Sequence, residues 1–82
     1  MSIIMFYFCD EWKTLGSLRL PEGVFADTPS GREKLIAFLM ETGDAIEISN
    51  EADFFELIRQ GEIGKANNLL TYGFLETETV IE

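Results

Sequence analysis

The chain has 82 residues and a formal net charge of −9, from 15 acidic and 6 basic residues with no histidine. Apolar residues make up 46% of the chain and aromatic residues 12%, which is enough for a compact core. We therefore expect one folded domain spanning residues 1–82 and not a disordered chain. The charge disfavours direct binding to nucleic acid or to an anionic membrane, because both would repel the chain, and it favours a basic partner.

The N-terminal segment and the cysteine content indicate where such a chain resides. Residues 1–8 are mostly apolar but too few for a transmembrane helix, and they lack the positive start and cleavage site of a signal peptide. The single cysteine, Cys9, cannot form an internal disulfide. We therefore expect a chain without a membrane segment in a reducing compartment, the cytoplasm.

Two strands are predicted before the first helix. Ile3–Cys9 is continuously apolar, which is typical of an interior strand covered on both faces of its sheet. Ser17–Leu20 alternates polar and apolar residues, as a half-buried strand does. After the turn at residues 21–23, Val24–Ala26 is expected to be a short continuation of that strand.

The first helix has two possible starts. Ser30 and Glu33 have the spacing of a capping box, while Thr28 could cap a helix whose first residue is Pro29. The apolar residues of Leu35–Met40 cover about half of the helix circumference, which is more than contact with one sheet requires. A second element or a partner is expected to cover the excess.

The second half is predicted to add two helices between two strands. Ala45–Ser49 alternates as a short strand, with Glu47 pointing outward. Ser49 or Asn50 caps a helix that buries Phe54, Phe55 and Ile58 and ends near Gly61. A weaker helix, with Ile63, Ala66 and Leu70 on one stripe, follows and stops at Gly73, and Phe74–Glu82 is the last strand.

The element order is thus expected to be β-β-α-β-α-α-β. This order predicts a small α+β domain in which two to three helices pack on a mostly antiparallel sheet of about four strands.

The negative charge is concentrated in the second half. Residues 1–40 carry five acidic and four basic residues, a net charge of −1, whereas residues 41–82 carry ten acidic and two basic residues, a net charge of −8. In the last strand, Glu76 and Glu78 share one face about 6.5–7 Å apart, and Glu47 could extend this row if its own strand pairs nearby. The row either protects an edge strand from aggregation or forms a surface that a basic partner recognises.

Catalytic chemistry is not expected. Without histidine, the usual general base, catalytic triads and zinc sites are missing. Cys9 fits a small buried residue better than a nucleophile, and no calcium-loop pattern appears among the carboxylates. We therefore predict that the chain is not an enzyme and has no catalytic residue, no metal site and no cofactor.

The leading hypothesis is a non-catalytic inhibitor that occupies a basic, nucleic-acid-binding surface of a protein or ribonucleoprotein. In this hypothesis a set of carboxylates supplies the electrostatic attraction, and an aromatic side chain, Trp12 or Tyr72, supplies an apolar anchor unless it only covers the core. The acidic set is Glu47, Asp53, Glu56, Glu76, Glu78 and Glu82.

Small phage-encoded inhibitors of host nucleases or CRISPR complexes, and immunity proteins against nuclease toxins, share this size and charge but no motif with the chain. For a phage protein, the compartment would be the cytoplasm of the host cell. The alternative is a structural or regulatory module that binds a partner, or a second copy of itself, through the apolar face of Leu35–Met40. Its acidity would then only keep the chain soluble.

Overall fold

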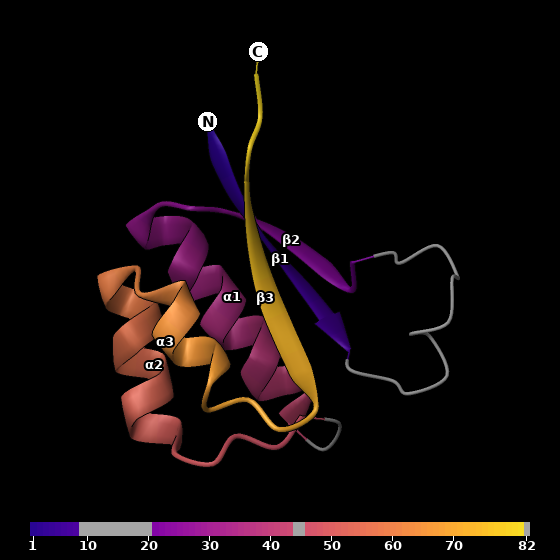
Figure 1. Ribbon diagram of the computed structural model, residues 1–82, viewed down its shortest axis with the longest axis vertical. Coiled ribbons are helices and arrows are strands. Elements are labelled where there is room, and N and C mark those ends of the chain that lie inside the picture. Colours follow the sequence, from indigo (N-terminus) through magenta and orange to yellow (C-terminus); the bar gives the residue numbers. More distant parts are fainter. Residues whose placement is uncertain (9–20, 44–45, 82) are drawn as a thin grey trace.

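The computed structural model describes residues 1–8, 21–43 and 46–81. These residues form a small α+β domain with a three-stranded antiparallel sheet and three helices (Figure 1). The elements are β1 (Ser2–Phe8), β2 (Gly23–Ala26), α1 (Pro29–Glu41), α2 (Glu51–Gln60), α3 (Ile63–Asn67) and β3 (Gly73–Thr79).

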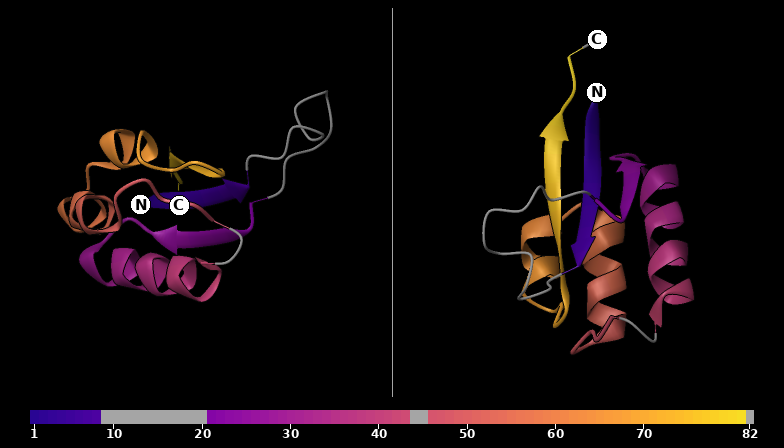
Figure 2. Two further views of the ribbon diagram at one scale, coloured as in Figure 1. Left: turned by 90° about the horizontal axis from the view of Figure 1, so that it is seen from below. Right: turned by 90° about the vertical axis from the view of Figure 1, so that its right-hand side faces the viewer.

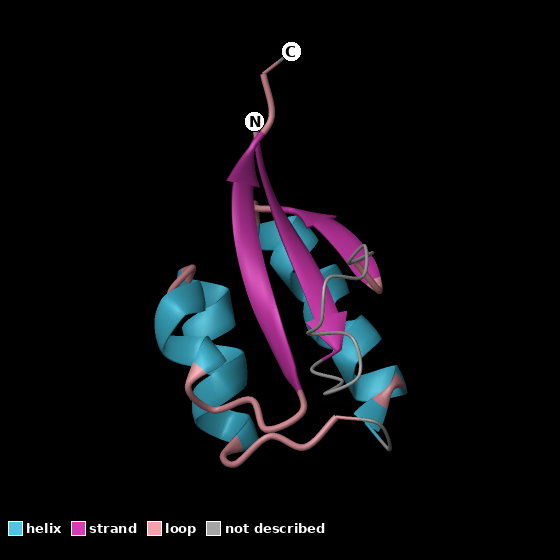
Figure 3. Ribbon diagram, turned by 45° about the vertical axis from the view of Figure 1, so that its right-hand side comes forward, coloured by secondary structure: helices cyan, strands magenta, loops and turns pink. Residues whose placement is uncertain are grey.

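The sheet has the strand order β2-β1-β3, so β1 is the central strand, as its apolar sequence predicted. Ile4 lies opposite Phe25 of β2 and Thr77 of β3, and both pairings are antiparallel. All three helices lie on one face of the sheet, with α2 between α1 and α3 (Figures 2 and 3). The domain therefore has two layers, one of helices and one of strands.

The core lies between these two layers. Ile4 and Phe6 of β1 are fully buried because they point toward the helices. The other buried apolar residues are Leu35, Ile36, Leu39, Ile46, Phe54, Phe55, Ile58, Ile63, Ala66 and Leu75. The central strand is thus buried at alternate positions, and its remaining residues, Ile3, Met5 and Tyr7, are half-buried. The sequence predicted that both faces of β1 are covered, but within the described residues the helices cover only one.

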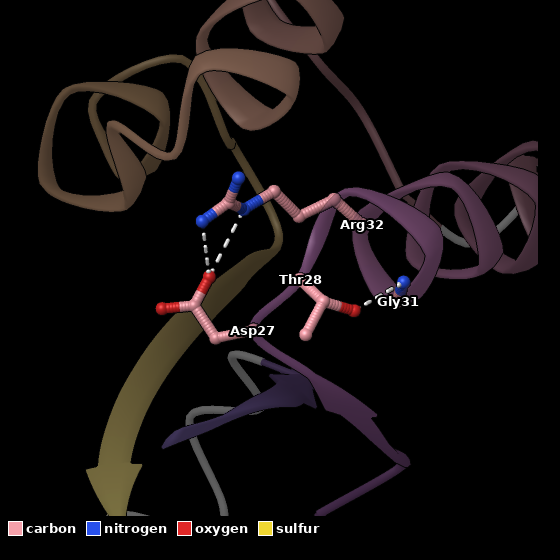
Figure 4. A network of polar contacts seen from close by, with 4 residues as sticks. All are labelled: Asp27, Thr28, Gly31 and Arg32. Carbon is pink, nitrogen blue, oxygen red and sulfur yellow. Dashed lines mark hydrogen bonds and ion pairs between the residues drawn. The ribbon is translucent and has the colours of Figure 1, made fainter. Parts of the chain in front are cut away.

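Of the two possible starts of α1, the structure has the earlier one, in which Thr28 and not Ser30 is the cap. The Thr28 hydroxyl accepts a hydrogen bond from the backbone N–H of Gly31 at 3.0 Å, and Pro29 is the first helical residue (Figure 4). Next to this cap, Nε and Nη2 of Arg32 both donate to Oδ1 of Asp27, at 3.0 and 2.8 Å (Figure 4). The two residues between β2 and α1, Asp27 and Thr28, are therefore both bonded to the first turn of α1.

The broad apolar arc of α1 is mostly used within the chain. Its buried members are Leu35, Ile36 and Leu39. Phe38 is half-buried, and its ring lies 6.2 Å from that of Phe6 and 5.5 Å from that of Phe25, centre to centre. Met40 remains 64% exposed. The width of the arc is thus explained mainly by contact with both the sheet and α2, without a partner.

The fourth strand predicted at Ala45–Ser49 is not formed by the described part of that segment. Residues 46–49 run beside residues 69–71 instead of joining the sheet, with one isolated bridge between Ile48 and Leu70. The backbone N–H of Thr71 donates to the carbonyl of Glu47 at 2.7 Å. The predicted alternation is still present, because Ile46 is buried and Glu47 is exposed. The alternation of residues 46–49 thus predicted which side chain is buried, but not that this segment lies beside residues 69–71.

The ends of α2 agree with the sequence, whereas α3 is shorter than expected. Asn50 caps α2, and Gly61 ends it with a left-handed φ of 82°. The stripe of apolar residues predicted a helix reaching Gly73, but α3 ends at Asn67. Beyond this point the chain turns back to enter β3, and the side chain of Asn67 binds the backbone of that strand. The predicted strand at Ser17–Leu20 lies outside the described residues.

Candidate binding surface

The carboxylates of β3 lie on the face of the sheet that points away from the helices. Glu76 lies opposite Met5 and Glu78 opposite Ile3 in the pairing of β3 with β1. The residue before them, Leu75, is buried on the helix side. Because side chains alternate along a strand, both exposed glutamates project to the other side, about 6.5–7 Å apart. The alternation predicted from the sequence is confirmed at these positions.

Next to these glutamates, the same face of the sheet carries an apolar strip. It consists of Ile3, Met5, Tyr7, Val24 and Phe74. The rings of Tyr7 and Phe74 are stacked, with centroids 5.0 Å apart and an interplanar angle of 11°. Val24 is 54% exposed. Glu76 and Glu78 therefore form an acidic border along one side of an apolar strip, which is the arrangement of a polar rim beside a hydrophobic contact area.

The predicted carboxylates Asp53 and Glu56 lie elsewhere, on the exposed side of α2. Asn50 donates to Oδ2 of Asp53 at 3.1 Å, and Gln60 donates to Oε1 of Glu56 at 3.0 Å. Because α2 belongs to the helix layer, these side chains do not share a face with the glutamates of β3 (Figure 2). They border a shallow hollow of about 280 Å³, lined by Asp53, Glu56, Leu57, Gln60, Lys65 and Leu69. This hollow carries both charge signs, and Lys65 is paired with Glu62 at 3.0 Å.

The remaining predicted residues fall into two groups. Glu47 and Tyr72 lie near one another, because the backbone of Thr71 is bonded to that of Glu47. Tyr72 is 50% exposed, so it is not a core residue. Because Thr71 lies just before the start of β3 at Gly73, Glu47 lies beside that end of the strand and does not extend the row of Glu76 and Glu78. Trp12 and Glu82 lie outside the described residues.

Two features of this surface were missed in the sequence. A continuous apolar run shows no difference between its two sides, so the sequence of β1 predicts a strand covered on both faces and does not reveal the apolar strip. The second feature is Asn67, whose side-chain amide bonds both backbone groups of Leu75: Nδ2 donates to the carbonyl at 2.8 Å, and Oδ1 accepts from the N–H at 2.7 Å. A side-chain contact across eight residues leaves no periodic signal, so nothing in the sequence could have indicated it.

No metal-binding cluster of three or more acidic or cysteine side chains occurs among the described residues. In the same part of the chain, every helix is too short or too polar to cross a bilayer. Comparisons with protein families, with curated proteins and with solved structures gave no match to this chain.

Proposed function

We propose that this chain is a non-catalytic binding protein that occupies a basic surface of a partner protein, of the kind that otherwise binds nucleic acid. The observation that carries the proposal is the placement of Glu76 and Glu78 beside an apolar strip on the face of the sheet opposite the helices. Carboxylates on such a border attract and orient a basic partner, while the apolar strip provides the area that is removed from water on binding.

The charge of the whole chain supports the same partner. A net charge of −9 accelerates encounters with a basic surface and repels nucleic acid and other acidic proteins. A partner covered in this way could no longer bind nucleic acid through the same surface. The proposed biological effect is therefore inhibition by occupation, as in phage-type inhibitors of host nucleases or CRISPR complexes.

Capture of partners from a lysate of the source cell or its host, followed by binding measurements on the captured protein, tests this function. We expect a basic nucleic-acid-binding protein whose affinity falls at least tenfold between low and physiological salt, and which nucleic acid displaces. The variant Glu76→Lys/Glu78→Lys is expected to lose this binding while it remains folded.

The matched control is Glu33→Lys/Glu41→Lys, which makes the same change in net charge on two exposed residues of α1. We expect the control to retain most of the affinity, because α1 lies on the opposite side of the sheet. Equal losses in the two variants would show that only total charge matters. Binding that is insensitive to both variants and to salt would refute the proposed function.

A second candidate function is favoured by the apolar strip alone. Val24, on the outer strand β2 beside Met5, is 54% exposed, so the strip could be the contact area of an interaction module whose acidity serves only solubility. This candidate predicts that Val24→Asp abolishes binding and that Glu76→Lys/Glu78→Lys does not. The homodimer version of this candidate predicts, in addition, a dimer in light scattering that Val24→Asp converts to a monomer.

A further inference from the structure

The hydrogen-bond pattern of the sheet shows which backbone groups of β3 point away from it. Along an antiparallel strand, successive residues bond alternately to the two sides. The carbonyls of Ser2 and Phe6 accept from the β2 side, at 2.9 and 2.7 Å. Met1, by contrast, exchanges two hydrogen bonds with Val80, at 2.6 and 3.2 Å. The odd-numbered residues of β1 therefore bond to β3.

This alternation assigns the outer edge of β3. Glu76 and Glu78, which lie opposite Met5 and Ile3, bond inward to β1. The N–H and carbonyl groups of Leu75, Thr77 and Thr79 consequently point outward, on the side of β3 where the described residues form no neighbouring strand. Those at Leu75 are satisfied by the side-chain amide of Asn67, which takes the place of a paired strand at that position.

Beyond Asn67 the edge is unpaired. Within the described part of the chain, the outward backbone groups of Thr77 and Thr79 have no hydrogen-bond partner. The C-terminal end of β3 extends past the helix layer (Figure 1). This explains why Thr77 and Thr79 are exposed although their side chains point to the same side as buried Leu75. The edge is therefore accessible over the residues that carry the acidic row.

We propose that an extended basic segment of the partner adds to this edge as a further strand, paired with Glu76–Val80. This inference rests on the proposed function and specifies how the basic partner is recognised. Partner residues that share a face with Glu76 and Glu78 would be Lys or Arg at alternate positions, because directly opposed unlike charges stabilise neighbouring strands. The residues between them would lie beside Thr77 and Thr79.

Two features define this occupant. A second copy of the chain is disfavoured, because an edge-to-edge pair would bring the glutamates of two β3 strands together in a dimer of net charge −18, twice the −9 of one chain. Asn67 limits the length of the added strand, because its amide already occupies the backbone groups of Leu75. The segment thus starts beside Glu76 and continues toward the C-terminal end of β3.

A pair of synthetic peptides provides the probe. One peptide alternates lysine and threonine, and the other has the same composition with its lysines contiguous. By fluorescence anisotropy at low salt, we expect the alternating peptide to bind about tenfold more tightly. By amide hydrogen exchange, we expect the bound peptide to slow exchange at Thr77 and Thr79 about tenfold and to leave Glu76 and Glu78 unchanged, because their N–H groups already bond to β1.

The backbone contribution is tested by Thr77→Pro, with Thr77→Ala as its matched control. Proline removes the outward N–H without changing charge, and edge strands tolerate it where the N–H faces solvent. We expect the peptide to bind the Thr77→Pro variant about tenfold more weakly than Thr77→Ala. Proline removes one backbone hydrogen bond to the peptide, and its ring keeps the peptide backbone from approaching β3 closely. Peptides N-methylated on one or the other alternate set of residues give the same test with the unaltered protein: one set should prevent binding and the other should not.

The outcomes separate this inference from the function on which it depends. In one outcome, binding is lost in Glu76→Lys/Glu78→Lys, but Thr77→Pro binds as well as Thr77→Ala and the two N-methylated peptides bind equally well. This outcome would overturn strand addition and leave the acidic surface as the binding site. Failure of both peptides to bind, with a captured basic partner still dependent on the glutamates, would also overturn strand addition alone. Binding that depends on neither the glutamates nor the strand edge would overturn both.

Discussion

Replacement of Gly31 by alanine tests how α1 is fixed against the sheet. A methyl group at this position would lie 1.9 Å from the carbonyl oxygen of Ala26 and 2.7 Å from its carbon. Side-chain contacts of this kind are essentially never shorter than 3.0 Å, so the first turn of α1 and the end of β2 would have to separate by about an ångström. Both contacting atoms belong to the backbone, so a change of rotamer cannot relieve the clash.

The expected cost follows from two opposing effects. Overpacking a close contact lowers the free energy of unfolding by about 1–3 kcal/mol, and the upper part of this range applies because backbone must move. Alanine would otherwise gain about 1 kcal/mol over glycine in a helix. We therefore expect Gly31→Ala to lose about 2 kcal/mol, which corresponds to a fall in Tm of about 8–16 °C for a domain of this size.

Gly64→Ala is the matched control, because Gly64 lies in α3 and an added methyl group would have no neighbour within 4 Å. We expect this variant to gain about 0.5–1 kcal/mol from helix propensity. Thermal unfolding by circular dichroism and urea titration of both variants measure the difference. If Gly31→Ala were as stable as the original chain, the close packing of α1 on Ala26 would be refuted.

Smaller effects are expected at four other positions. Asn67→Ala should lower the free energy of unfolding by about 1–2 kcal/mol in urea titrations, because both backbone groups of Leu75 lose their partner; an unchanged midpoint would contradict the role of Asn67 at the edge. Asn50→Ala should cost about 1 kcal/mol through loss of the cap of α2, and helix content by circular dichroism should fall with it. Gly61→Ala should cost about 1 kcal/mol at its φ of 82°, whereas an increase in Tm would exclude the left-handed conformation. Asp27→Asn should cost about 1 kcal/mol at low salt, less at high salt, because it weakens a half-buried ion pair; an effect independent of salt would argue against that pair.

The sequence by itself determined the features that depend on neighbouring residues. Asn50 and Gly61 mark the two ends of α2 because a cap and a left-handed glycine act within one helical turn. The two faces of β3 follow from alternation alone, so the positions of Glu76 and Glu78 relative to Leu75 were predictable. For α1 the capping residues predicted two starts two residues apart, at Thr28 and at Ser30, and the helix begins at the first of them.

Only the tertiary structure decided which segments meet. Residues 46–49 have the alternation of a strand, but hydrogen bonds to residues 69–71 hold them outside the sheet. Asp53 and Glu56 resemble the glutamates of β3 in the sequence, yet the packing of α2 on the core places them on the other side of the domain. Burial, strand pairing and the bond from Asn67 to Leu75 join residues far apart along the chain. The energies of these contacts depend on the whole fold, so the periodicity of neighbouring residues does not predict them.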